Sequence, residues 1–74
     1  MQQLVECVPN FSEGRDPVKI STITARIEAI PGVTLLDVDL GADTNRTVVT
    51  FVGPIKAIED AAFQAIKTAG EVLD

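Results

Sequence analysis

Hydrophobic and polar residues alternate along two stretches in the middle of the chain, Val33–Leu40 and Thr47–Val52. Because successive side chains of a β-strand point to opposite faces of a sheet, this alternation predicts two strands. The second stretch is apolar on both faces, which is typical of a strand in the middle of a sheet. Between the two lies Gly41–Arg46, whose Gly, Asp and Asn residues favour a turn. The sequence therefore predicts an antiparallel strand pair.

The phase of the first strand decides which of its side chains face the core. One alternate set is the more apolar, and we expect it to cover the core: Thr34, Leu36, Val38 and Leu40. Asp37 and Asp39 then lie side by side on the opposite face. Two such carboxylates could act as acid and base or share a cation. A solvated strand face explains them as well, and from spacing alone it is the commoner case.

Two amphipathic helices are predicted, one before and one after this strand pair along the chain. Asp16 followed by Pro17 is typical of an N-cap and a first helical residue, so the first helix spans about Pro17 to Ala29. Its apolar stripe recurs at helical spacing: Ile20, Ile23, Ile27 and Ile30. The second helix begins near Pro54 and has a stripe of mostly small side chains: Ile58, Ala62, Ala65, Ala69 and Val72.

A further strand is predicted near the start of the chain, over Gln3–Val8, and a loop follows at Asn10–Arg15. Pro9 should end the strand because proline has no N–H to donate. The order β-α-β-β-α predicts an α+β fold, a ferredoxin-like split β-α-β unit whose last strand is missing. The antiparallel sheet would carry both helices on one face. The missing strand would leave the edge of Gln3–Val8 open, and such an edge invites pairing with another chain.

Charge and composition exclude several classes of function. The net charge of −5 disfavours binding to nucleic acids and to anionic membranes. No apolar run approaches the roughly 20 residues of a transmembrane helix, and the first residues do not resemble a signal peptide. With a single cysteine, nothing indicates an oxidising compartment, so we expect a cytoplasmic protein.

The length of 74 residues allows one small domain, whose core barely offsets the entropy of ordering the chain. Chains of this size often depend on disulfides, a metal or a partner. One cysteine and the absence of histidine leave the partner as the expected support, either further polypeptide or a second copy in a homo-oligomer. We expect no metal site, because no Cys/His spacing of the required kind occurs.

Polar side chains near the predicted strand ends are the remaining candidates for chemistry. Arg46 could bind a carboxylate through two parallel hydrogen bonds, or it could pair with Asp43 at the surface. Asn10 could orient a substrate amide or carboxylate, or it could satisfy its own turn. Cys7 has no histidine to activate it and is expected to be an inert, buried thiol. No phosphate-binding glycine loop is present, and a Ser-His-Asp triad cannot form without histidine.

Two blocks of the sequence resemble glutamate formimidoyltransferases. The first block is Leu4–Gly14, LVECVPNFSEG, and the second runs from Leu35 to Pro54 and contains LLDVDLG, TNRTV and TFVGP. The likeness covers essentially the whole chain. Residues 1–74 are therefore identified as an incomplete N-terminal subdomain of a formiminotransferase.

The resemblance implies an enzyme that moves the formimino group from N-formimino-L-glutamate to tetrahydrofolate in histidine degradation. Folate would bind in a groove that a second subdomain of the same enzyme closes. The family's catalytic histidine belongs to a segment after the end of this chain, so we expect residues 1–74 alone to be inactive. By the same resemblance, Asp39 would orient that histidine or hold the cationic formimino group. The substrate contacts would come from Asn10, Asn45 and Arg46, with Arg46 binding a carboxylate.

Two alternatives remain consistent with these residues. One is a non-catalytic ferredoxin-like interaction module that dimerises through the open sheet edge. The other is a formyltransferase that uses N-formylglutamate, because such relatives could share this whole stretch. In animals a cyclodeaminase domain follows the transferase, and nothing in these 74 residues indicates one.

Overall fold

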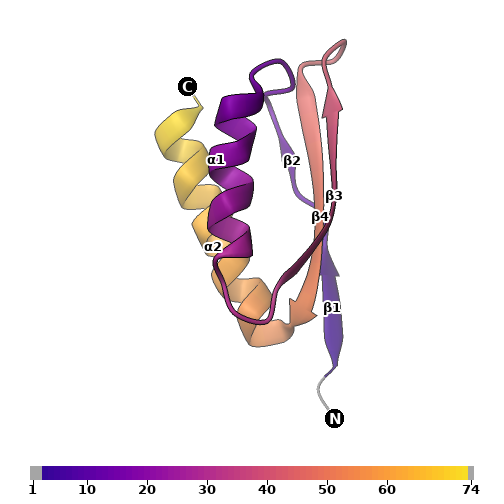
Figure 1. Ribbon diagram of the computed structural model, residues 1–74, viewed down its shortest axis with the longest axis vertical. Coiled ribbons are helices and arrows are strands. Elements are labelled where there is room, and N and C mark those ends of the chain that lie inside the picture. Colours follow the sequence, from indigo (N-terminus) through magenta and orange to yellow (C-terminus); the bar gives the residue numbers. More distant parts are fainter. Residues whose placement is uncertain (1–2, 74) are drawn as a thin grey trace.

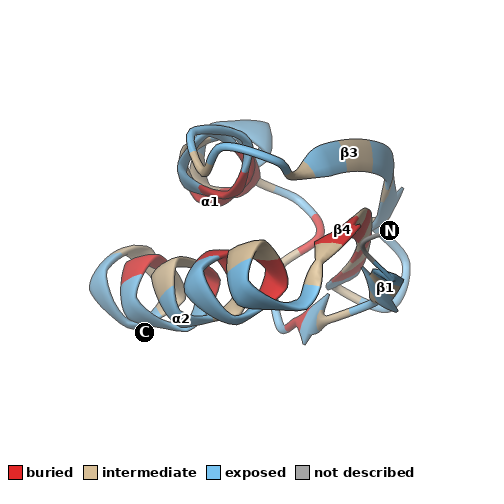
Figure 2. Cartoon of the chain, turned by 90° about the horizontal axis from the view of Figure 1, so that it is seen from below, coloured by how far each residue is buried: buried red, intermediate tan, exposed pale blue. Residues whose placement is uncertain are grey.

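The computed structural model describes residues 3–73, and in it two helices lie on one face of an antiparallel sheet (Figures 1 and 2). The elements follow in the order β1 (Leu4–Cys7), β2 (Asn10–Phe11), α1 (Pro17–Glu28), β3 (Thr34–Gly41), β4 (Arg46–Pro54) and α2 (Ile55–Val72). β4 is central, with β1 and β2 along one side and β3 along the other. The predicted α+β class is confirmed, and so is the central place of the predicted strand Thr47–Val52, which lies in β4.

β1 and β2 behave as one strand that Pro9 interrupts. Both pair with β4 in the same continuous register. Between them the Pro9 carbonyl accepts a hydrogen bond from the backbone N–H of Val49 at 3.1 Å, and Pro9 has no N–H to return. β1 ends at Cys7, before Pro9, as predicted, but the pairing with β4 resumes at Asn10 once the proline is passed. Asn10 therefore belongs to a strand and not to a loop.

A β-bulge in β3 sets which of its side chains face the helices. The pairing with β4 shifts by one residue between Leu35 and Asp37. As a result Leu35 and Val38 both pack against the core although they are three residues apart, and Leu36 is 55% exposed. The predicted phase was right for Val38 and for the exposed Asp37 and Asp39. It was wrong before the bulge, where Leu35 and not Leu36 faces the core.

α1 begins where the sequence predicts, because Asp16 caps it. The Asp16 Oδ1 accepts hydrogen bonds from the backbone N–H groups of Val18 at 3.0 Å and Lys19 at 3.4 Å. Its predicted stripe faces the core: Ile20, Ile23 and Ile27 are buried, and Ile30 packs against them. The helix ends at Glu28, one residue before the predicted end, and the chain turns at Gly32 with a φ of 92°.

α2 follows β4 directly, with Pro54 as its N-cap. Its buried side chains are small or medium-sized, namely Ile58, Ala61, Ala65 and Thr68. The predicted stripe is thus displaced at Ala62, which is only half-buried, whereas Ala69 and Val72 pack against the core as predicted. Figure 2 shows α2 on the β1 side of the sheet and α1 on the β3 side. Within residues 3–73, neither helix combines the length and the apolar character that crossing a membrane requires.

The core fills the space between the two helices and the inner face of the sheet. Its central strand β4 contributes Val49 and Phe51, both with 0% exposure. The neighbouring strands and the helices supply the rest: Phe11, Ile20, Ile23, Ile27, Ile58, Ala61 and Ala65. No helix or strand of residues 3–73 covers the opposite face of the sheet (Figure 1).

Candidate functional site

The uncovered face of the sheet carries the polar side chains of its strands. Along β4, Thr47 and Val49 are fully buried against the helices, whereas Val48 between them is half-buried on the other face. Because paired residues of neighbouring strands point to the same face, the partners of Val48 lie on the uncovered face as well. These partners are Asn10 on β2 and Asp39 on β3.

Asn10 and Asp39 thus flank Val48 in one row of the sheet, and both are exposed. Neighbouring strands lie about 4.8 Å apart, so the two backbones are separated by roughly 10 Å. An amide and a carboxylate therefore lie on either side of the apolar side chain of Val48 on this face. The alternative in which Asn10 only satisfies its own turn is wrong, because Asn10 lies in a strand.

Arg46 is the first residue of β4 and lies two positions before Val48, on the same face. Its side chain is exposed. Within residues 3–73 the structure shows one ion pair, between Lys19 Nζ and a Glu13 carboxylate oxygen at 3.9 Å, so Arg46 does not pair with Asp43. The guanidinium is therefore available to an anion that approaches this face.

Asn45 occupies the turn directly before Arg46. Its φ is 53°, a left-handed conformation that asparagine tolerates better than most residues. Its side-chain Oδ1 accepts a hydrogen bond from the backbone N–H of Gly14 at 3.0 Å. The structure therefore brings Asn45 beside Arg46, but its side-chain oxygen is bound to the loop that precedes α1.

That loop, residues 12–16, is fastened to the start of β4 by further contacts. The buried Thr47 hydroxyl donates a hydrogen bond to the Glu13 carbonyl. The Glu13 carboxylate accepts hydrogen bonds from the backbone N–H groups of Arg15 at 3.2 Å and Asp16 at 3.0 Å. Sequence reasoning missed these roles of Thr47 and Glu13. The one available signal was a threonine in the alternate set of β4 that also holds Val49 and Phe51.

The sequence also offered Asp37 and Cys7 as candidates, and neither lies in the row of Asn10 and Asp39. Asp37 pairs with Thr50 on the uncovered face, next to the row that contains Asp39. Cys7 packs against the core but is half-buried, and not buried as predicted. Within the described residues, no three His, Cys, Asp or Glu side chains gather where they could hold a metal ion.

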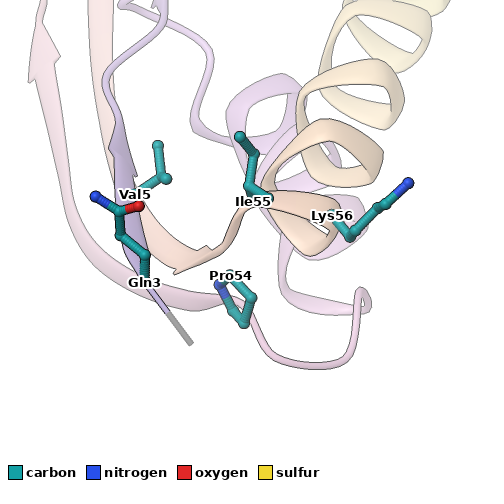
Figure 3. A pocket seen from close by; sticks show the side chains of 5 residues that line it. All are labelled: Gln3, Val5, Pro54, Ile55 and Lys56. Carbon is teal, nitrogen blue, oxygen red and sulfur yellow. The ribbon is translucent and has the colours of Figure 1, made fainter. Parts of the chain in front are cut away.

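Two hollows lie at the opposite end of β4 from this row. The first has a volume of about 190 Å³ and an apolar lining, and Figure 3 shows it between β1 and the first turn of α2, lined by Gln3, Val5, Pro54, Ile55 and Lys56. The second lies around Gly32 and Ala57. None of the predicted site residues lines either hollow, so the candidate site lies apart from both.

The family model described as formiminotransferase domain, N-terminal subdomain, matches residues 4–74. The chain belongs to this family. The two blocks that carried the resemblance meet in space at the site: Leu4–Gly14 supplies β1, β2 and the loop, and the second block supplies β3, the turn and β4. The hydrogen bond between Gly14 and Asn45 joins the two blocks directly.

Named relatives of this formiminotransferase subdomain include enzymes from distant organisms. Over 74 residues the chain is 53% identical to a formimidoyltransferase-cyclodeaminase from Gallus gallus and 49% identical to a glutamate formimidoyltransferase from Streptococcus pyogenes serotype M1. It is 48% identical over 71 residues, 96% of the chain, to a glutamate formimidoyltransferase from Thermoplasma acidophilum. The whole chain aligns with the first two, but it spans only 14%, 25% and 23% of the three relatives, respectively.

Proposed function

We propose that this subdomain is the first part of a glutamate formimidoyltransferase that acts in histidine degradation. The match over residues 4–74 to a formiminotransferase subdomain carries this proposal. In the reaction, the bond between the formimino carbon and the glutamate nitrogen of N-formimino-L-glutamate breaks. A bond between the same carbon and a nitrogen of tetrahydrofolate forms, and glutamate leaves.

The uncovered face suits the glutamate end of such a donor. Asp39 and Arg46 lie diagonally across neighbouring strands, where backbone positions are about 7–8 Å apart. A carboxylate on one side and a guanidinium on the other can hold the cationic formimino group and the substrate carboxylate of one small molecule. Asn10 would contact the same molecule from the far side of Val48, and Asn45 completes the set at the turn.

Catalysis needs groups that this chain does not contain. Proton transfer to and from the tetrahedral intermediate requires a side chain that titrates near neutral pH, most often histidine. The 74 residues include no histidine. The net charge of −5 also opposes the binding of anionic glutamate and folate. The histidine and most of the positive charge would therefore come from the rest of the parent enzyme, and Asp39 could orient that histidine.

The open edge of β1 and the exposed apolar side chains of α2 support a second subdomain as partner. β1 pairs with β4 alone among the described strands, so its outer edge has unpaired backbone groups. On α2, which lies on the β1 side of the sheet, Phe63 and Ile66 are 63% and 72% exposed. We propose that later polypeptide of the same enzyme covers this edge and the uncovered sheet face, leaving a groove for folate. The enzyme would be a homo-oligomer in the cytoplasm, without nucleic-acid or membrane partners.

Two alternative functions are each supported by one specific observation. The open β1 edge also favours a non-catalytic module that dimerises edge to edge. A formyltransferase would use the same carboxylate and guanidinium for N-formylglutamate, although the neutral formyl group has less need of Asp39.

The deciding experiment assays the full-length enzyme that contains this segment with N-formimino-L-glutamate and with N-formylglutamate, each in the presence of tetrahydrofolate. We expect turnover with the formimino donor and at most slow turnover with the formyl donor. Preference for the formyl donor would support the formyltransferase instead. An inactive full-length protein that sediments as a dimer, with a dimer interface that a proline in β1 abolishes, would support the interaction module.

A further inference from the structure

We infer that Asn45 is a positioning residue: its side-chain oxygen fastens the loop of residues 12–16 to the turn before β4 and thereby holds Arg46 in place. This inference rests on the proposed function, in which Arg46 binds the substrate carboxylate. It assigns Asn45 a role different from that of a direct substrate contact.

The first observation is the conformation of Asn45 together with its long-range hydrogen bond. With a φ of 53°, it is the one non-glycine residue of the described chain in the left-handed region. From there its Oδ1 accepts the Gly14 N–H at 3.0 Å, a contact between residues 31 positions apart. Asparagine meets both demands, because it tolerates the left-handed backbone and also offers an acceptor oxygen. Alanine would meet neither, and glycine would meet only the first.

The second observation is that the fastened loop touches the backbone of Arg46 itself. A Cβ at Gly14 would lie 2.7 Å from both the nitrogen and the oxygen of Arg46 and 2.6 Å from the Gly41 oxygen. On the far side of Arg46, the Thr47 hydroxyl bonds the Glu13 carbonyl. Two hydrogen bonds from the loop therefore flank Arg46, one at the residue before it and one at the residue after it.

These contacts connect Asn45 to Arg46 through the loop. Without the Asn45 bond, the loop would keep the hydrogen bond to Thr47, and the backbone of Arg46 would keep its pairing with Gly41 but lose one of the two loop hydrogen bonds that flank it. A long arginine side chain on a looser backbone binds a carboxylate less well, because part of its conformational freedom must be lost on binding. The loss would appear in the KM for the donor rather than in kcat.

Three variants of the full-length enzyme test this inference. Asn45→Asp keeps an acceptor oxygen and tolerates the left-handed backbone, whereas Asn45→Gly keeps the backbone and removes the acceptor. Thr44→Ala is the matched control, because its hydroxyl bonds only the Gly41 carbonyl within the turn, at 3.2 Å. Each variant is measured in two ways: hydrogen–deuterium exchange of the peptide that contains Gly14, and kcat and KM for N-formimino-L-glutamate.

We expect Asn45→Gly to speed the exchange of the Gly14 amide and to raise KM about tenfold, the scale of one hydrogen bond, with kcat changed less than twofold. Asn45→Asp should restore both slow exchange and a KM near that of the wild type, and Thr44→Ala should change neither. Slow exchange in Asn45→Asp combined with a raised KM would overturn the inference in favour of a direct contact through the amide nitrogen. Unchanged exchange in Asn45→Gly would overturn it as well. If the wild-type enzyme shows no formimino transfer, the proposed function fails, and the exchange measurement still decides whether Asn45 fastens the loop.

Discussion

Asn10 and Asp39 both pair with Val48, each from an opposite side of the central strand. The first lies near the start of the chain and the second lies 29 positions later, and only the insertion of β4 between their strands brings them into one row. The split β-α-β order thus assembles a polar row on the uncovered face. The predictions below test which members of this face matter and what holds them there.

Asp39→Asn tests whether the carboxylate of this row acts in the reaction. The substitution keeps the size of the side chain and removes its charge, so the cationic formimino group loses its ionic partner. In the full-length enzyme we expect kcat/KM for N-formimino-L-glutamate to fall at least tenfold, about 1.4 kcal/mol of transition-state stabilisation. Steady-state kinetics measure this directly.

Asp37→Asn is the matched control for that experiment, because Asp37 lies on the same strand and face one row away. Its kcat/KM should stay within about twofold of the wild type. Equal losses in the two variants would show that the strand face as a whole, and not Asp39, provides the negative charge.

Arg46→Ala tests the carboxylate contact. Loss of a bidentate, charge-assisted pair should raise the KM for the donor at least tenfold. Arg26→Ala serves as the control, since Arg26 is also exposed but lies in the last turn of α1. Isothermal titration of glutamate, which has the carboxylates but not the formimino group, should show the same loss for Arg46→Ala. A normal glutamate affinity would place the carboxylate contact elsewhere.

Gly14→Ala should destabilise the subdomain because the new Cβ meets backbone atoms that cannot move independently. The nearest is the Gly41 oxygen at 2.6 Å. We expect overpacking to cost about 1–3 kcal/mol in the free energy of unfolding. Urea denaturation followed by circular dichroism measures the change.

Gly70→Ala provides the opposite control in the same chain. Among residues 3–73, nothing lies within 4 Å of a Cβ built at Gly70, which is exposed inside α2. Replacing a glycine in a helix interior by alanine should stabilise the protein by about 0.5–1 kcal/mol. A destabilised Gly70→Ala variant would mean that another part of the parent enzyme packs against this position.

The elements of the fold could be predicted from local patterns, because their signals are local. Asp16 and the isoleucine stripe mark α1, and the turn at Gly41–Arg46 marks the hairpin. The bulge could not be predicted, because Leu35 and Leu36 are the same residue type and either one could face the core. The continuation of pairing after Pro9 was also hidden, since only the position of the Val49 N–H shows that the Pro9 carbonyl is used.

The candidate site was likewise only partly predictable from the sequence. Family resemblance pointed to Asn10, Asp39, Asn45 and Arg46, and the structure brings all four to the hairpin end of the sheet or to its uncovered face. What sequence could not show is that the Asn45 oxygen is bound to Gly14, because this contact joins residues 31 positions apart. A residue named by its resemblance can act on the substrate or on its neighbours, and only the geometry separates the two.

The exposed apolar side of α2 leads to a last prediction about the rest of the enzyme. Phe63 and Ile66 lie one helical turn apart and are more than 60% exposed in this subdomain. α2 lies on the β1 side of the sheet, and we expect polypeptide that pairs with the β1 edge to continue over the exposed side of α2. In the full-length enzyme, replacing both with glutamine should therefore lower the free energy of unfolding by about 2–4 kcal/mol, since burial of two large apolar groups is lost.

Val18→Gln, at an equally exposed position near the start of α1, should stay within about 0.5 kcal/mol of the wild type. Full stability of the double variant would show that the parent enzyme leaves this side of α2 in water, and the proposed covering of the β1 edge would then have to come from another direction.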